Sequence, residues 1–97
     1  MAKVYITMIE LSGGNGVRNI INVWYGPNKT YSSTDTGRST EEMADLIDGK
    51  IHRVWVSDPD TGQEAEVTVV RPTGRPRHLR TKPDDDPNDN LLKLPKK

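Results

Sequence analysis

The sequence predicts an α+β fold in which an antiparallel sheet of four to five strands, arranged as a meander, carries one short helix on one face. Three observations predict it. Short segments alternate apolar and polar residues with the period of a strand, turns containing glycine or proline separate them, and one segment has the cap and spacing of a helix. We expect this domain to span residues 1–82 and an extended C-terminal arm to span residues 83–97.

The first two strands are predicted over residues 3–10 and 17–25, because apolar and polar residues alternate in both. Residues 11–16 read Leu-Ser-Gly-Gly-Asn-Gly and supply the backbone freedom that a turn needs. The two strands should therefore form an antiparallel hairpin with a long glycine loop. With strict alternation, one face of the first strand holds Val4, Ile6 and Met8, and one face of the second holds Ile21, Val23 and Tyr25.

The helix is predicted to begin after Ser39 and to end at Gly49, and the polar residues 30–38 before it should form a loop. Ser39 and Glu42 have the spacing of a capping box, in which each side chain binds the backbone amide of the other. Met43 with Leu46 and Ile47 forms one apolar stripe. Because so short a helix is unstable alone, we expect it to pack on the sheet.

The third and fourth strands are predicted over residues 51–57 and 64–71, joined by the Pro- and Gly-containing turn at residues 58–62. In the fourth strand Ala65, Val67 and Val69 alternate with polar residues, which is typical of a half-buried antiparallel strand. After another turn, residues 77–81 could form a short edge strand. No segment repeats another, so a single meander accounts for the pattern.

Composition limits how such a domain can be stabilised. The chain has 97 residues, of which 32% are apolar, and it has no Phe and no Cys. A core this thin is marginal without help, disulfides are excluded, and a metal site is not expected because only His52 and His78 remain as good zinc ligands. We therefore expect a homo-oligomer. With no apolar run of membrane length and no signal peptide, a soluble cytoplasmic protein without membrane partners or cofactors is expected.

Charge is segregated although the formal net charge is zero. Residues 71–82 hold five basic side chains and no acid, and the acids that follow have no base between them. Arginine matches phosphate and carboxylate groups with two parallel hydrogen bonds, and nearby aromatic rings would stack a base. The candidate ligand-binding residues are Arg71, Arg75, Arg77, His78 and Arg80, with Trp24 and Trp55. The separation of basic and acidic residues favours a simpler interpretation. These arginines would pair with Asp84, Asp85, Asp86 and Asp89 and so hold the C-terminal arm against the domain.

Two other patterns imitate ligand sites. Residues 84–90 alternate oxygen-bearing side chains like a calcium loop, but the sixth position is Asp89 instead of glycine and the twelfth is Pro95 instead of glutamate. We therefore favour solvated acids or salt bridges there. Residues 12–16 could form an anion nest, but a phosphate loop is followed by a helix and here a strand follows, so a hairpin turn is favoured.

No set of catalytic residues emerges from the sequence. The chain has no Cys nucleophile, and His52 lies within a predicted strand. The serines at positions 32, 33 and 39 belong to a polar loop and to a helix cap. Because a histidine with nearby aspartates is too common a combination to indicate a triad without geometry, we do not expect an enzyme.

Several of these segments occur in a characteristic order. The chain carries Leu11-Ser12-Gly13-Gly14, Ser39-Thr40-Glu41-Glu42-Met43, Arg71-Pro72-Thr73-Gly74-Arg75-Pro76, Leu79-Arg80-Thr81 and Asp89-Asn90-Leu91-Leu92-Lys93-Leu94-Pro95. In these motifs it resembles a family of short bacterial and phage proteins known only as a domain of unknown function. The resemblance covers nearly the whole length and implies no activity and no site. The run Asp84-Asp85-Asp86 departs from the family's single acid.

The function that these observations favour is a small non-enzymatic binding or scaffold protein that acts as a homo-oligomer. Its arm would dock Leu91, Leu92 and Leu94 on its own sheet or on that of a neighbour, since a disordered tail has no use for apolar side chains. The alternative is a binder of anionic ligands through residues 71–82: a nucleotide, a signalling nucleotide or, less favoured, a single-stranded nucleic acid. Such a protein could work by sequestering nucleotides.

The arm provides a test of this interpretation. Deleting residues 88–97 should lower the melting temperature by several degrees, as a loss of about 1–2 kcal/mol would in so small a domain. Differential scanning fluorimetry of the intact and truncated chains measures it. An unchanged melting temperature would mean that the leucines await a partner.

Overall fold

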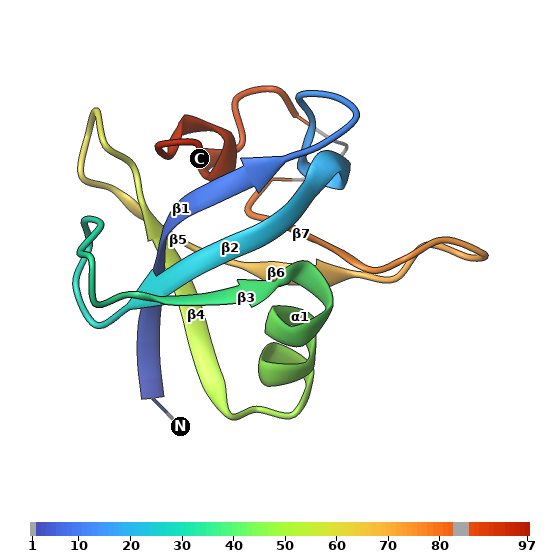
Figure 1. The fold of residues 1–97 in the computed structure, drawn as a ribbon, viewed down its shortest axis with the longest axis horizontal. Helices are drawn as coiled ribbons and strands as arrows, with labels where there is room; N and C mark the ends of the chain where they lie inside the picture. The colour runs from blue at the N-terminus through green and yellow to red at the C-terminus, as the bar shows by residue number, and fades with distance from the viewer. Residues whose placement is uncertain (1, 83–85) are drawn as a thin grey trace.

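The computed structural model describes residues 2–82 and 86–97, which form two sheets, one α-helix and two short 3-10 helices (Figure 1). The boundary expected at residue 83, and the carboxylates of Asp84 and Asp85 that belong to the calcium-like pattern, lie outside the described residues. Within them the fold is α+β, as predicted.

The larger sheet has five strands in the order β3-β2-β1-β4-β5. They are β1 (Ala2–Leu11), β2 (Ile20–Gly26), β3 (Thr36–Ser39), β4 (His52–Ser57) and β5 (Glu64–Glu66). The smaller sheet pairs β6 (Thr68–Val70) with β7 (His78–Arg80). The helices are α1 (Thr40–Asp48) and the 3-10 helices η1 (Val17–Asn19) and η2 (Asn90–Lys93).

The sheet is mixed, so the expectation of a purely antiparallel meander was wrong. β1 pairs with β4 in parallel, from Ala2 opposite His52 to Tyr5 opposite Trp55, whereas the other pairs are antiparallel. The chain leaves the β3 edge, crosses the sheet through α1 and re-enters it beside β1, and such a crossover brings a strand back in the same direction. Alternation of apolar residues carries no information on strand direction.

Two segments differ from the elements expected. Residues 36–39 are polar, yet they form β3 against β2, because an edge strand needs backbone partners more than an apolar face. Residues 17–19, expected as the start of a strand, form η1, where the Asn19 side chain accepts a hydrogen bond from the amide of Gly16 (3.1 Å). The predicted fourth strand is divided into β5 and β6, which belong to different sheets.

A β-bulge changes which face the end of β1 presents. The pairing advances from Ile6–Tyr25 to Met8–Trp24, so Thr7 is one extra residue on β1. Past this point the alternation is reversed, so Ile9, which is fully buried, shares the core face with Val4 and Ile6, where strict alternation placed Met8.

The same correction applies to β2. Ile21 is the extra residue between the pairs Asn22–Glu10 and Ile20–Leu11. It is 43% exposed, whereas Ile20 is 3% exposed. Each bulge therefore removes one apolar side chain from the face that strict alternation gave it.

The helix has the predicted cap. The Ser39 hydroxyl accepts from the amide of Glu42 (3.1 Å), and the Glu42 carboxylate accepts from the amide of Ser39 (2.9 Å). Gly49 ends the helix and donates to the carbonyl of Asp45 (2.9 Å). Met43 is fully buried, as its place in the apolar stripe predicts.

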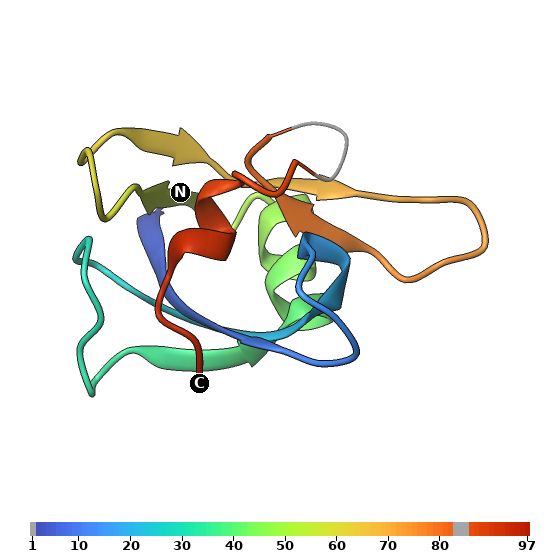
Figure 2. The same cartoon turned by 90° about the horizontal axis from the view of Figure 1, so that it is seen from above.

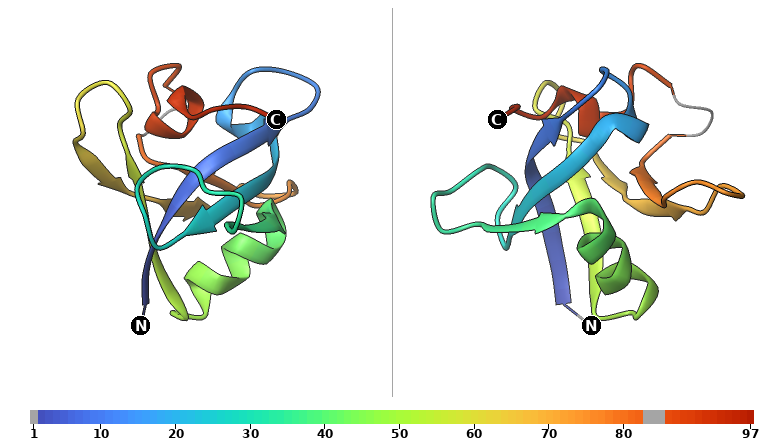
Figure 3. Two further views of the ribbon diagram at one scale, coloured as in Figure 1. Left: turned by 60° about the vertical axis from the view of Figure 1, so that its left-hand side comes forward. Right: turned by 45° about the vertical axis from the view of Figure 1, so that its right-hand side comes forward.

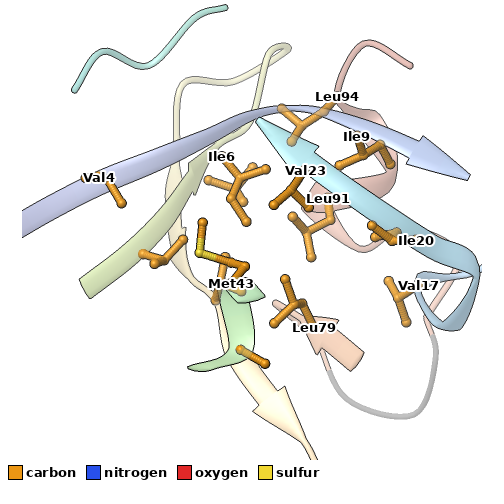
Figure 4. Packing of buried hydrophobic residues seen from close by; sticks show 14 residues of the cluster. Val4, Ile6, Ile9, Val17, Ile20, Val23, Met43, Leu79, Leu91 and Leu94 are labelled. Atoms are coloured by element: carbon orange, nitrogen blue, oxygen red, sulfur yellow. The ribbon is translucent and has the colours of Figure 1, made fainter. Parts of the chain in front are cut away.

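One hydrophobic core lies between the larger sheet, α1, the smaller sheet and η2 (Figure 4). Leu91 is fully buried in it and Leu94 is 4% exposed, while Leu92 packs against it. The core residues that the figure labels are Val4, Ile6, Ile9, Val17, Ile20, Val23, Met43, Leu79, Leu91 and Leu94.

A buried carboxylate joins β7 to the C-terminal segment (residues 86–97). Asp89 is 0% exposed, and its Oδ2 accepts from the amides of Thr81 (2.8 Å) and Lys82 (2.9 Å). Its Oδ1 accepts from the Thr81 hydroxyl (2.6 Å) and from the amide of Leu91 (3.0 Å), which caps η2. These four hydrogen bonds satisfy a carboxylate whose burial would otherwise be unfavourable.

The end of the segment lies beside β1 (Figure 3). Ile9 donates its amide to the carbonyl of Pro95 (3.1 Å) and accepts from the amide of Lys97 (2.9 Å), which places Lys96 in a parallel bridge with Ile9. At Ile9 one edge of β1 is paired with β2. The C-terminal segment pairs with the opposite edge, which nearer the N-terminus is paired with β4.

Removing the Asp89 carboxylate should therefore destabilise the whole domain. The Asp89→Ala change leaves three buried or half-buried amides without an acceptor. We expect a loss of about 3 kcal/mol in the free energy of unfolding, measured by urea denaturation, which is more than the sequence alone predicted for deleting residues 88–97. The matched control is Asp86→Ala, since within residues 2–82 and 86–97 the Asp86 carboxylate accepts one hydrogen bond, from the nearby amide of Asn88 (2.8 Å). It should cost no more than about 1 kcal/mol; equal losses would contradict the assignment.

Candidate functional site

The predicted basic segment forms the loop of a hairpin that protrudes from the molecule. Residues 71–77 connect β6 to β7, and Figures 1 and 2 both show this loop extending beyond the rest of the fold. Gly74 has φ +72°, and Arg75 donates its amide to the carbonyl of Pro72 (3.3 Å), so the tip is a tight turn. We call β6, β7 and this loop the basic hairpin (residues 68–80).

A pocket of about 240 Å³ lies between the basic hairpin and η1. We call it the hairpin pocket; Arg18, Pro72, Arg75, Pro76, Arg77 and His78 line it. A neighbouring hollow of about 300 Å³ shares Arg18, Pro76 and Arg77 with it and extends to the start of α1 at Ser39 and Thr40. The structure thus brings an arginine of η1, which the sequence did not single out, to three of the predicted binding residues.

Arg77 is held by the acids of α1. Its guanidinium donates to Glu41 (2.7 Å), Asp45 (2.6 Å) and Asp48 (2.9 Å), and these hydrogen bonds raise the pKa of Arg77 above its ordinary value. Arg71 also pairs with Asp48. The sequence predicted aspartates that follow the segment as partners, and for these two arginines that was wrong, because the hairpin folds back over α1.

The other predicted residues of the hairpin differ in their surroundings. Arg75 is exposed at the tip, and His78 is 5% exposed beside the hairpin pocket. Arg80 is half-buried in β7, where its carbonyl accepts from the Thr68 hydroxyl (3.4 Å). Neither Arg71 nor Arg80 is among the residues that line the pocket.

Trp24 and Trp55 do not join the arginines. Trp55 lies in β4 between Val54 and Val56, which point into the core, so its indole is on the opposite face of the larger sheet, which we call the outer face. The Nζ of Lys3 lies 4.8 Å from the ring centroid of Trp55, and the Nζ of Lys97 lies 4.9 Å from that of Trp24. These cations cover the ring faces that a stacked ligand would need.

A carboxylate at the edge of the outer face pairs with two lysines, one of which is Lys3. Glu64 pairs with Lys3 (3.0 Å) and Lys29 (3.0 Å), and the Tyr5 hydroxyl donates to it (3.2 Å). The hydrogen bonds from Lys29 and Lys3 lower the pKa of Glu64 from 4.5 to about 2. Glu64 therefore fastens β5 to β1 and to the loop that follows β2.

A third pocket, of about 320 Å³, was not predicted from the sequence. It lies where β4 ends, and its lining includes Thr7, Lys29, Tyr31, Ser57, Asp58 and Leu94. These residues come from four separate segments, each of which looks like an ordinary turn or strand end. No pattern along the chain could have shown that they meet.

The structure thus defines a small mixed-sheet α+β domain with a pocket lined by three arginines at a protruding hairpin. The chain belongs to the family described as "Protein of unknown function (DUF3892)", whose sequence profile matches residues 5–95. No curated protein and no solved structure matches the chain. Among residues 2–82 and 86–97, none of the helices has the length and apolar character to cross a bilayer, and no cluster of acids and histidines could hold a metal ion.

The depressed pKa of Glu64 makes part of the stability depend on pH. Since the folded-state pKa lies below the ordinary value, Glu64 stabilises the fold fully above pH 4.5 and loses this effect as the pH falls towards about 2. The melting temperature of the intact protein should exceed that of Glu64→Gln at neutral pH, and the two should converge in acid. The control Glu66→Gln, which removes one exposed pair with Arg53 (3.3 Å), should track the intact protein throughout.

Proposed function

We propose that this protein is a non-enzymatic binding protein that takes an anionic ligand between the basic hairpin and η1. One observation carries the proposal: cationic side chains from two distant parts of the chain, Arg18 and Arg75, line one pocket together with His78. Guanidinium groups bind phosphate and carboxylate oxygens with geometry that a lysine lacks.

The arginines of the site have different tasks. Arg77 is neutralised by α1, so it fixes the position of the hairpin and contributes little charge to a ligand. Arg75 is exposed at the tip and lines the same pocket, so it is free to turn towards an anion. Arg77 therefore holds the hairpin in place, and Arg75 is available to bind the ligand.

The size of the pocket favours a phosphate-bearing small molecule. A volume of about 240 Å³ suits a phosphate with part of a sugar, and the adjoining hollow of about 300 Å³ would take the remainder of a nucleotide or signalling nucleotide. Single-stranded nucleic acid is less favoured, because Trp24 and Trp55, which would stack its bases, lie on the outer face. Sequestering a nucleotide is the action this proposal implies.

The homo-oligomer expected from the composition is part of the proposal. Its support is the outer face, where Trp24 and Trp55 stay partly exposed beside Lys97 and Lys3, and where a second copy would cover the exposed parts. The need for it is smaller than the composition suggests, since Leu91 and Leu94 enlarge the core of a single chain.

Binding of nucleotides should depend on Arg75 and Arg18. Isothermal titration calorimetry with nucleoside monophosphates, nucleoside triphosphates and cyclic dinucleotides should detect binding to the intact protein. Arg75→Ala, and separately Arg18→Ala, should weaken it about tenfold, as loss of a charge-assisted hydrogen bond predicts.

The matched control is Arg53→Ala, because Arg53 is an exposed arginine that lines neither this pocket nor the hollow beside it. Arg77→Ala is unsuitable, since it also frees three acids on one face of α1. No binding to the intact protein, or equal binding by Arg75→Ala and Arg53→Ala, would overturn the proposal. Binding of a short single strand with an affinity that falls steeply as salt is added would identify a nucleic acid instead of a nucleotide.

A further inference from the structure

The third pocket lies where the two parallel strands part. β1 and β4 pair only as far as Tyr5 opposite Trp55. Beyond this pair the bulge at Thr7 bends β1, and the C-terminal segment takes the place beside Ile9 that β4 would otherwise occupy. In open α/β sheets a ligand usually binds in the crevice at the carboxyl ends of parallel strands, and β1 and β4 are the parallel pair of this mixed sheet. We call it the strand-end pocket.

Three segments wall the strand-end pocket. They are the loop that follows β2, the turn that follows β4 and the C-terminal segment, and Figure 2 shows them in teal, yellow and red, facing one another. Its volume of about 320 Å³ falls within the range of small-molecule sites. It does not share any lining residue with the hairpin pocket.

The loop that follows β2 is fastened by a buried hydroxyl. Thr7, which is 1% exposed, donates from Oγ1 to Oδ2 of Asp35 (2.6 Å), and the amide of Ser32 donates to the same oxygen (3.2 Å). At Gly26 a Cβ atom would lie 2.1 Å from Oδ1 of Asp35, so only glycine lets the carboxylate approach β2. Tyr31 is therefore carried by a loop that is anchored at its far end.

The opposite wall is fastened by another carboxylate. Asp58 is 7% exposed, and it accepts from the amide of Asp60 (2.8 Å) and from Nζ of Lys93 (3.0 Å). These two hydrogen bonds hold the pKa of Asp58 below its ordinary value, so the carboxylate is ionised at neutral pH. The turn after β4 is thereby tied to η2, and the pocket is formed before any ligand arrives.

The polar groups of the pocket define what it can bind. Within the described residues, the hydroxyls of Ser57, Thr30 and Tyr31 have no hydrogen-bond partner. A carboxylate has about four acceptor positions, and two of those on Asp58 are used by Asp60 and Lys93. Hydroxyl groups that both donate and accept thus stand beside a carboxylate that only accepts.

The apolar part of the lining adds shape. Tyr31, which is 45% exposed, lines the pocket together with Leu94 and Pro95. The cations nearby are already paired, Lys29 with Glu64 (3.0 Å) and Lys93 with Asp58 (3.0 Å). An anion would meet the ionised Asp58, so the pocket favours a neutral molecule with one apolar face and several hydroxyls.

We propose that the strand-end pocket is a binding site for a neutral ring that carries vicinal hydroxyl groups, such as a sugar residue or the ribose of a nucleoside. Tyr31 packs against the apolar face of the ring, and Asp58 accepts from neighbouring hydroxyls. Ser57 at the end of β4 supplies the remaining hydrogen bond from the floor. This site is independent of the hairpin pocket and differs from it in the charge of its ligand.

The test is a titration of the ¹⁵N-labelled protein followed by amide chemical shifts. One arm uses neutral sugars (glucose, galactose, mannose, N-acetylglucosamine and their disaccharides), and the other uses adenosine, guanosine, cytidine and uridine. At least one probe should shift the amides of Thr30, Tyr31 and Ser57. Shifts in the sugar arm identify a carbohydrate ligand, and shifts in the nucleoside arm alone identify a nucleoside.

Three variants make the test specific. Tyr31→Ala should weaken binding at least tenfold, whereas Tyr31→Phe, which keeps the ring, should weaken it less than about threefold. Ser57→Ala removes only a hydroxyl without a partner and should weaken binding several-fold at unchanged melting temperature. Ile51→Ala, at an isoleucine that is 56% exposed and does not line the pocket, is the control and should bind like the intact protein.

Two results would overturn the proposal. One is that no probe of either arm shifts the amides around the strand-end pocket. The other is that Tyr31→Ala and Ser57→Ala both bind as tightly as Ile51→Ala. Because all probes are neutral, the outcome is separate from that of the nucleotide titration at the hairpin pocket.

Discussion

The buried carboxylate of Asp89 is the interaction on which the rest of the fold depends. Its two oxygens accept hydrogen bonds from Thr81 and Lys82, which follow β7, and from the amide of Leu91, which lies in the first turn of η2. These hydrogen bonds place Leu91 beside the core, and the chain that follows reaches the edge of β1. Asp89 is tolerated inside the protein because its carboxylate oxygens accept from backbone amides that would otherwise be unsatisfied.

Both pockets are consequences of how the second half of the chain closes on the first. The strand-end pocket exists because the C-terminal segment fills the place beside Ile9 and leaves an opening next to Thr7. The hairpin pocket exists because the acids of α1 pull Arg77, and with it the hairpin, against η1. Both pockets are therefore formed by contacts between distant parts of the chain and not by local sequence motifs.

Local chemistry could be predicted from the sequence and long-range geometry could not. Ser39 and Glu42 formed the cap they predict, since both partners lie within one turn. The parallel direction of β4 and the bulges at Thr7 and Ile21 depend on what each strand meets in space. For the same reason the arginines were recognised as a group, while the partners of Arg77 on α1 were not. Thr7, Ser57 and Asp58 had no shared signal, because their proximity arises only when β1 and β4 part.

The contact between Ile9 and the residues around Lys96 bears on how the protein comes to fold. Ile9 lies near the first residues of this sequence, and its backbone partners Pro95 and Lys97 lie near the last. Contacts between segments so far apart in the chain slow folding, because a long loop must close before they contribute. During synthesis β1 therefore exposes an unpaired edge, and a chaperone or a neighbouring nascent chain would find it there.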